Sequence, residues 1–297
     1  MVVLDSATST SQSAPPDWII YPACQYTFEQ LAEIYNATRI DYIVPMPMSA
    51  RRMEEYVHDY DVDLKHSIVI TGAGGHPAGI GMLGRRGRRG WLTRLGIVPH
   101  LRQHRLGHLL MRELLEYARA LELRQLQLEV IVGNEPAQRL FTRYDFMPTR
   151  ELLVLSRPPS AALPAQDTLL RVEALERADI QRYLVAGRRL SASWIDEPDS
   201  LIRNENLTGF LAHHPDGSSG WVACRRSRFQ ITHFAVDVPP HCAYDMILAL
   251  FTALHRAFPT QDAKFENFPA DAAGLDALHL LGYIEVFRRI EMQRPLP

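Results

Sequence analysis

Residues 95–108 read LGIVPHLRQHRLGH, and residues 128–146 read LEVIVGNEPAQRLFTRYDF. In the first stretch an apolar strand pattern passes through a polar loop into the leucine-rich residues 106–121, which predict a long amphipathic helix. Such a junction directs unpaired backbone N–H groups and the positive end of a helix dipole at one point. The first stretch therefore predicts an anion site suited to a pyrophosphate.

The second stretch places a carboxylate on a strand just before a helix. Glu129 lies on the opposite face of its strand from Leu128 and Val130, because side chains alternate with a period of two. Asn134 then opens a helical pattern over residues 136–144. Glu129 is therefore the titratable residue that stands out in this stretch, and a solvated or ion-paired strand glutamate is one interpretation of it.

The pattern around these stretches is mixed α/β and runs from residue 18 to residue 157 in the order β-α-α-β-β-β-α-β-α-β. Thr27 with Gln30 three residues later predicts a capping box at the first helix, and Ser49 opens the second. A hairpin is predicted around the tip GRRGRRG of residues 84–90. We interpret the tip either as a clamp for acidic acceptors, nucleic acid or a phosphate, or as a solvated charge cluster.

Together the two stretches resemble the GNAT acetyltransferase superfamily over residues 18–157. The first is similar to the family's acetyl-CoA loop, Q/R-x-x-G-x-G/A, and the second to its L-x-V-x-x-x-N-x-x-A-x-x-L-Y/F-x-x-x-G-F block. The resemblance implies a mostly antiparallel twisted sheet flanked by helices, with acetyl-CoA as cosubstrate and no metal. The cosubstrate-binding residues that it implies are Ile97, Val98, Arg102, Gln103, His104, Arg105, Leu106, Gly107 and Asn134.

Within this set the backbone near Ile97 and Val98 would pair with the pantetheine arm and polarise the thioester carbonyl. Arg102 and Gly107 match the ends of the loop, whereas Arg105 replaces the family's middle glycine. An arginine at that position either adds a cation for a phosphate or crowds the site. Asp145 replaces the glycine that closes the second block.

The resemblance also implies catalytic roles. In N-terminal acetyltransferases of the ribosomal-protein type, the glutamate of the LEV motif, here Glu129, removes a proton from the acceptor amine. The tyrosine that protonates the departing thiolate in those enzymes is replaced here by Phe141. Tyr144 on the same helix is the candidate replacement, with a partly buried core aromatic as the alternative. Asp41 and Tyr42 lie where the family builds its acceptor pocket, and are candidate substrate contacts or ordinary loop residues.

After a Pro- and Ala-rich linker at residues 158–167, the element order begins again over residues 168–297. This repetition predicts a tandem duplication. Where the copy should carry the loop, Pro239 and Pro240 remove two backbone N–H groups. We therefore predict a degenerate GNAT-like domain that no longer holds CoA and helps to wall the acceptor pocket of the first.

Composition narrows the class of protein further. A hydrophobic content of 46% and a charged content of 22% are typical of soluble globular proteins, and a net charge of -2 argues against nucleic acid as a partner. Residues 1–16 lack the features of a signal peptide, and no apolar stretch reaches the roughly 20 residues of a membrane span. A flexible tail, a cytoplasmic location and no membrane partner are expected. Three scattered cysteines and the unsupported histidines of residues 100–108 give no metal-site spacing.

These inferences predict an acetyl-CoA-dependent N-acetyltransferase that modifies a primary amine of a small molecule or peptide. Its assembly would be a monomer, with the tandem domains forming a pseudo-dimer, or a homodimer. The alternative is a non-catalytic regulatory protein of the same fold that binds CoA or another ligand.

Overall fold

The computed structural model describes residues 18–72, 74–102, 104–159, 161–164, 170–187, 192–203 and 206–297. The predicted tail of residues 1–16, part of the predicted linker, and Gln103 lie outside these ranges.

The first half contains the predicted order of strands and helices. Its elements are β1 (Ile19–Pro22), α1 (Phe28–Ala37), α2 (Ala50–Asp59), β2 (Ile68–Thr71), β3 (Pro77–Arg86), β4 (Arg89–Ile97), α3 (Leu106–Ala120), β5 (Gln125–Ile131), α4 (Glu135–Arg143) and β6 (Met147–Arg157). The capping box is confirmed: the Thr27 hydroxyl accepts from the Gln30 N–H, and the Gln30 side chain accepts from the Thr27 N–H. Both edges of β6 are paired, one with β11 and the other with β12.

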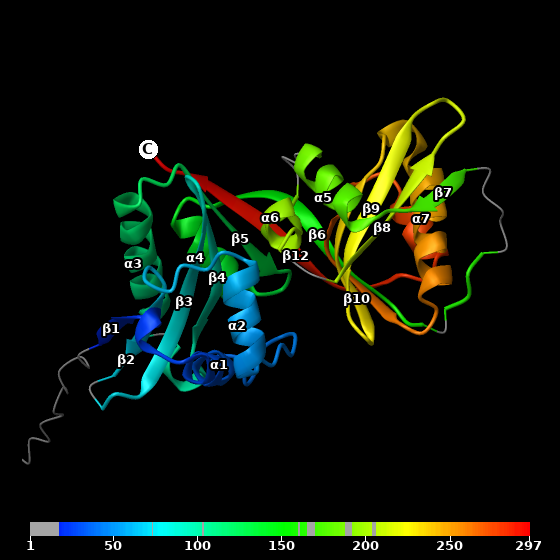
Figure 1. Ribbon diagram of the computed structural model, residues 1–297. Helices are drawn as coiled ribbons and strands as arrows, with labels where there is room; N and C mark the ends of the chain where they lie inside the picture. Colours follow the sequence, from blue (N-terminus) through cyan, green and yellow to red (C-terminus); the bar gives the residue numbers. More distant parts are fainter. Residues whose placement is uncertain are drawn as a thin grey trace, which may run out of the picture.

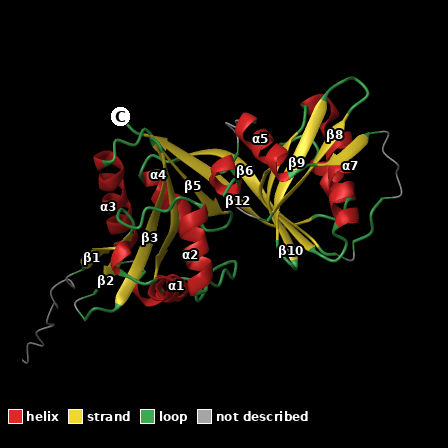
Figure 2. Cartoon of the chain, viewed as in Figure 1, coloured by secondary structure: helices red, strands yellow, loops and turns green. Residues whose placement is uncertain are grey.

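The second half repeats much of this order. Its elements are β7 (Arg171–Ala174), α5 (Arg177–Ala186), α6 (Pro198–Leu201), β8 (Leu207–His213), β9 (Ser219–Arg226), β10 (Gln230–Asp237), α7 (Ala243–Ala257), β11 (Asp262–Pro269), α8 (Leu275–Leu280) and β12 (Ile284–Pro295). Helices cover both faces of the sheet in each half (Figure 2).

The strands of the described residues form one sheet in the order β1-β2-β3-β4-β5-β12-β6-β11-β10-β9-β8-β7. Two neighbouring pairs within it are parallel, β4 with β5 and β10 with β11, and the other pairs are antiparallel. The parallel pairs occupy equivalent places in the two halves. The fold is therefore a mostly antiparallel, mixed sheet with two similar halves joined edge to edge.

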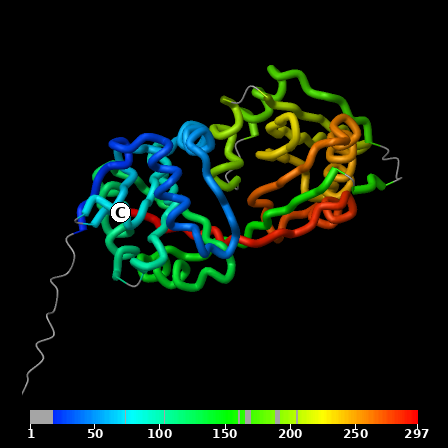
Figure 3. Tube along the Cα trace, turned by 90° about the horizontal axis from the view of Figure 1, so that it is seen from below, coloured from blue at the N-terminus to red at the C-terminus, as the bar shows by residue number. Residues whose placement is uncertain are grey.

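The strand β12 leaves the second half and completes the sheet of the first. It lies between β5 and β6, with Ile290 opposite Val130 and Arg289 opposite Leu152. Figures 1 and 3 show this red segment crossing from one lobe into the other. Residues 284–295 were expected to belong with residues 168–283, because an apolar pattern identifies a strand without identifying its partners. The sheet of the first half therefore does not end at residue 157.

The arginine-rich hairpin tip joins the halves. β3 ends at Arg86, and β4 begins at Arg89. Because side chains alternate along a strand, Arg86 and Arg89 point toward the second half. Arg85 and Arg88 are exposed. Arg89 donates to both carboxylate oxygens of Glu197, at 2.6 and 2.7 Å.

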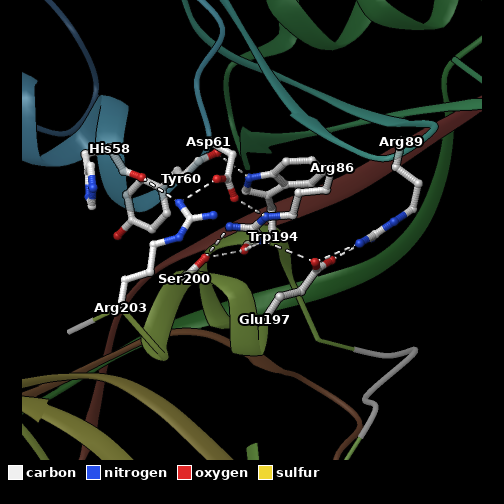
Figure 4. A network of polar contacts seen from close by, with 9 residues as sticks. All are labelled: His58, Tyr60, Asp61, Arg86, Arg89, Trp194, Glu197, Ser200 and Arg203. Atoms are coloured by element: carbon white, nitrogen blue, oxygen red, sulfur yellow. Dashed lines mark hydrogen bonds and ion pairs between the residues drawn. The ribbon is translucent and has the colours of Figure 1, made fainter. Parts of the chain in front are cut away.

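Arg86 lies at the centre of the polar contacts between the two halves (Figure 4). It donates to Asp61 at 2.7 Å, to Glu197 at 3.1 Å and to the carbonyl of Trp194 at 2.7 Å. Its guanidinium also lies over the indole of Trp194, which is fully buried and stacks on Trp91. Both interpretations of the tip are therefore wrong for Arg86 and Arg89, which form an internal ion-pair network instead.

Candidate functional site

Two adjoining pockets occupy the space where β4 and β5 separate. In the described residues β4 pairs with β5 only over Arg89–Trp91 and Gln125–Gln127. Beyond this point lie an outer pocket of about 820 Å³ beside α3 and α4, and an inner cavity of about 220 Å³ that contains Glu129. The residues that line both are Arg39, Tyr42, Leu95, Asn134, Ala137 and Phe141. The two spaces therefore meet at one junction.

The outer pocket contains the start of α3. This helix begins at Leu106 without a side-chain cap, so its first-turn N–H groups are not satisfied by a capping side chain. Arg105 at the N-cap has a φ of +59°, a left-handed conformation that glycine adopts without strain. Arg105 thus keeps the backbone shape for which the family uses glycine. Gly107 is packed closely, because a Cβ there would lie 3.1 Å from Leu140.

The structure brings most of the predicted cosubstrate residues together and separates others. The predicted residues that line the outer pocket are Ile97, Arg102, Arg105, Leu106, Gly107 and Asn134. His104 is exposed beside a different pocket, next to Trp18 and Tyr144.

Val98 does not present its backbone N–H to the pocket, because that group donates to the carbonyl of Ala78 on β3 at 2.9 Å. The carbonyls of Leu95 and Ile97 instead accept from Arg39 and Arg102, so they point away from β3. N–H and C=O groups of one strand residue point the same way. The open strand edge therefore lies at Leu95 and Ile97, and the expectation for Val98 is corrected.

Asp41 and Tyr42 take different places. Asp41 lies at the rim of the outer pocket, where its hydrogen bond from Arg102 lowers the pKa of its carboxyl group. Asp41 therefore lines the outer pocket and not the inner cavity, and its role as an acceptor contact stays a prediction. Tyr42 lies at the junction, and its hydroxyl accepts from the side chain of Asn134 at 3.2 Å.

Glu129 has one paired and one unpaired carboxylate oxygen. The indole N–H of Trp91 donates to Oε2 at 2.7 Å, whereas Oε1 is buried without a partner in the described residues. Burial raises the pKa of Glu129 to about 7; the hydrogen bond from Trp91 opposes this increase, and the carboxylate of Glu291 adds to it. A carboxylate with such a pKa exchanges protons near neutral pH, as a general base does.

Tyr144 is not brought to Glu129. Its hydroxyl donates to the carbonyl of His108 at 3.1 Å, and its side chain lines neither the outer pocket nor the inner cavity. The position of Tyr144 therefore does not support the predicted acid role. Phe141 does line both spaces, but it has no proton to give.

Three residues of the inner cavity that lie at β-bulges were not identified from the sequence. Arg94 on β4, His233 on β10 and Asn267 on β11 have φ values of +53°, +55° and +60°. Left-handed backbone at non-glycine residues is uncommon and gathers at functional sites. In the sequence these three residues stand out only as polar residues within apolar strands, and this pattern does not identify a bulge.

The second half supplies part of the wall of the inner cavity, and whether that cavity takes the acceptor stays a prediction. The residues involved are Ile195, His233, Glu266, Asn267 and Arg289. Within the described ranges, no cluster of three or more His, Cys, Asp or Glu side chains is arranged to hold a metal ion. No helix in the described part of the chain is long and apolar enough to span a membrane.

Comparisons with known proteins agree with this geometry. Residues 28–146 match the family model described as the Acetyltransferase (GNAT) family. No curated protein sequence matches the chain. A GCN5-related N-acetyltransferase from Sphaerobacter thermophilus has a similar structure, with a TM-score of 0.69 and 16% identity over 94% of this chain and 95% of that one.

Two further solved structures are similar to this chain over both halves. A tandem GNAT protein from the clavulanic acid biosynthesis pathway has a TM-score of 0.63 and 14% identity, over 94% of this chain and 98% of that one. A GCN5-related N-acetyltransferase from Anabaena variabilis has a TM-score of 0.57 and 16% identity, over 94% of this chain and 73% of that one. At these identities the comparisons establish the GNAT fold.

Proposed function

We propose that this chain, whose residues 28–146 form a GNAT domain, is an N-acetyltransferase that transfers an acetyl group from acetyl-CoA to a primary amine. The observation that carries the proposal is the junction between the two pockets. It gives a cosubstrate in the outer pocket and an amine in the inner cavity one place to meet, beside Glu129. Direct transfer in a ternary complex follows from this arrangement.

The outer pocket fits acetyl-CoA in shape and charge. The N–H groups at the start of α3, which the side chain of Arg105 does not cap, and the guanidinium of Arg105 suit a pyrophosphate. The open backbone edge at Leu95 and Ile97 suits the amide groups of the pantetheine arm. The residues on the opposite side of the pocket, from Asn134 to Leu140, complete the groove.

The reaction needs a base and a proton donor. Oε1 of Glu129 would accept a proton from the ammonium form of the acceptor, and the freed amine nitrogen would attack the thioester carbon. The carbon–sulfur bond then breaks, the nitrogen releases its remaining extra proton to solvent, and the departing thiolate needs a proton. Tyr42 is the hydroxyl best placed to provide it, because its side chain lines both pockets. Exchange with solvent would then restore the protonation of both residues.

Calorimetric titration with acetyl-CoA tests the first part of this proposal. Gly107→Trp should abolish binding, because the site has no room for an indole beside Leu140. His104→Trp is the matched control, since His104 belongs to the same loop but lies outside the outer pocket. Equal loss in both variants, or no binding by the wild type, would contradict the proposed cosubstrate site.

One observation favours the second candidate, a non-catalytic CoA-binding regulator. Phe141 occupies the position of the acid and is nearly buried, so the usual proton donor is absent. Transfer to a panel of primary amines separates the two functions. The enzyme requires transfer that Glu129→Gln removes without weakening CoA binding, whereas the regulator binds CoA and transfers to no amine.

A further inference from the structure

The inner cavity holds a cation and a carboxylate that do not pair with each other. Arg94 and Glu129 both line it, yet no ion pair joins them. Oε1 of Glu129 and Nε of Arg94 are each buried without a hydrogen-bond partner among the described residues. Two opposite unpaired groups in one small cavity are costly unless a ligand completes both.

Arg94 is held in place by aromatic rings and one hydroxyl. Its Nη1 donates to the hydroxyl of Tyr35 at 2.9 Å, and its guanidinium lies 4.0 Å from the ring centre of Tyr56. No described residue places a carboxylate within 4 Å of it. Although burial lowers the pKa of Arg94, the neighbouring Tyr56, Tyr35 and Glu266 hold it above the usual value. The group is therefore a permanent cation without a carboxylate partner.

A β-bulge is what turns Arg94 into the cavity. Thr93 contacts Tyr56 on the α1–α2 side of the sheet, and Leu92 packs on the α3 side. Regular alternation would place Arg94 on the α3 side with Leu92. Instead, Arg94 and Leu95 together oppose Gly81, and the left-handed conformation of Arg94 directs it to the same side as Thr93.

Two arginines that line the cavity, Arg94 and Arg39, have no carboxylate partner among the described residues, and the Nε of each is buried without a hydrogen-bond partner there. Arg289 donates to Glu266 at 3.0 Å and to Asn267 at 2.6 Å, so its charge is paired. Burial lowers the pKa of His233, which keeps this residue neutral. Arg39 at the junction donates to the carbonyl of Leu95 and adds positive potential.

We propose that the acceptor is a small amine that also carries a carboxylate, a compound of the amino-acid class. Its carboxylate would bind Arg94 while its amine faces Oε1 of Glu129. This inference rests on the proposed function and specifies its substrate. The volume of about 220 Å³ and the walls from both halves suit a small molecule better than a protein side chain.

Matched acceptors test the inference. The panel contains α-amino acids and ω-amino acids of increasing length. Each acid is compared with its carboxamide and with its decarboxylated amine. Acetyl transfer is followed by CoA release and product mass. The wild type should prefer the acid member of at least one set by about 10- to 100-fold in kcat/KM, the range for one charge-assisted contact. Arg94→Gln should remove that preference by raising KM for the acid only, and Arg94→Lys should restore part of it.

The neutral partners and a surface variant serve as controls. Turnover of the carboxamide by Arg94→Gln reports a folded enzyme, and Arg51→Gln removes an exposed arginine from α2 without changing the preference. Equal use of acid and carboxamide by the wild type overturns the inference while leaving the proposed function intact. A preference for phosphorylated amines over every amino acid overturns it as well.

A binding measurement covers the case in which no amine is acetylated. The same panel is then titrated calorimetrically in the presence of CoA. Selective binding of an acid member that Arg94→Gln loses supports the anion site although the proposed function has failed. Absence of selective binding overturns both.

Discussion

Glu291 on β12 lies directly opposite Glu129 on β5, in register on adjacent antiparallel strands. The negative charge of Glu291 is neutralised by Arg150 on β6, which donates to both of its carboxylate oxygens at 2.8 and 3.0 Å. Glu129 has no such ion pair among the described residues and keeps only the hydrogen bond from Trp91. Two carboxylates in one register therefore differ in environment, and the unpaired one faces the cavity.

The pH dependence of acetyl transfer should follow the pKa of Glu129. Only the deprotonated carboxylate can accept a proton, so kcat/KM should increase with pH and level off above about 7. An ordinary glutamate would give a plateau that begins near pH 5. Rates measured from pH 5 to 9, with an acceptor whose own ionisation is known, would separate the two. A flat profile across pH 6–8 would argue against Glu129 as base.

The stability of the folded protein should also depend on Glu129, but it should decrease with rising pH whereas the rate increases. The folded-state pKa lies above the ordinary value of 4.5, so the protein favours protonated Glu129. This stabilisation is complete below about pH 4.5 and is lost as the pH rises through about 7. Glu129→Gln should therefore become more stable than the wild type as the pH rises, by at most about 3 kcal/mol at pH 8. Urea unfolding at pH 4.5, 6 and 8 measures the difference, which should be smallest at pH 4.5.

The two tyrosines near the site should respond differently to loss of their hydroxyl groups. Tyr42→Phe should reduce kcat by about 100-fold, the lower range for a general acid, with little change in acetyl-CoA binding. Tyr144→Phe should change kcat by less than about twofold, because that hydroxyl contacts only His108 and lies outside the cavity. Steady-state kinetics on both variants decides the assignment, and the reverse ranking would restore Tyr144 as the candidate acid.

The hairpin tip offers a matched pair of arginines for measuring the junction between the halves. Arg86→Gln removes a guanidinium that is 7% exposed and contacts Asp61 and Glu197, so it should destabilise the protein by about 3 kcal/mol. Arg85→Gln, one residue away on the exposed face, should change the free energy of unfolding by less than about 0.5 kcal/mol. Chemical denaturation of both variants tests this. Equal effects would mean that the network contributes nothing specific.

Ending the chain at residue 283 removes β12 and should prevent the first half from folding stably. β5 and β6 would then lose the strand between them and expose unpaired backbone along both edges. We expect loss of near-UV circular dichroism and of cooperative unfolding in the truncated chain. Adding a peptide of residues 284–297 should restore both signals. A truncated chain that unfolds cooperatively without the peptide would contradict this role of β12.

The parts of the fold that depend on local pattern were predictable from the sequence. The capping box at Thr27 and the helix after Arg105 involve residues within a few positions of one another. Glu129 was named from the resemblance to the family's LEV motif, and its role as a base stays a prediction. Ile97 was named from the resemblance, as part of the fourth strand; it lines the outer pocket, and its role toward a cosubstrate stays a prediction.

The parts that depend on distant segments were not predictable. The register of β12 against β5 and the contact of Arg86 with Glu197 join residues far apart in the chain, and no periodicity encodes such pairs. The bulge at Arg94 could not be predicted for another reason. It places the side chain on the face of the sheet opposite to the one that regular alternation predicts. The error over Val98 arose similarly, from the direction of a single N–H group.

The position of β12 also has a consequence for synthesis on the ribosome. Domains generally fold as they emerge, with N-terminal ones first. Here the first half leaves the ribosome without the strand that fills the space between β5 and β6, and it must wait while the whole second half is translated. The two halves therefore complete the shared sheet together, and the inner cavity, whose walls come from both halves, forms only when the whole chain has been made.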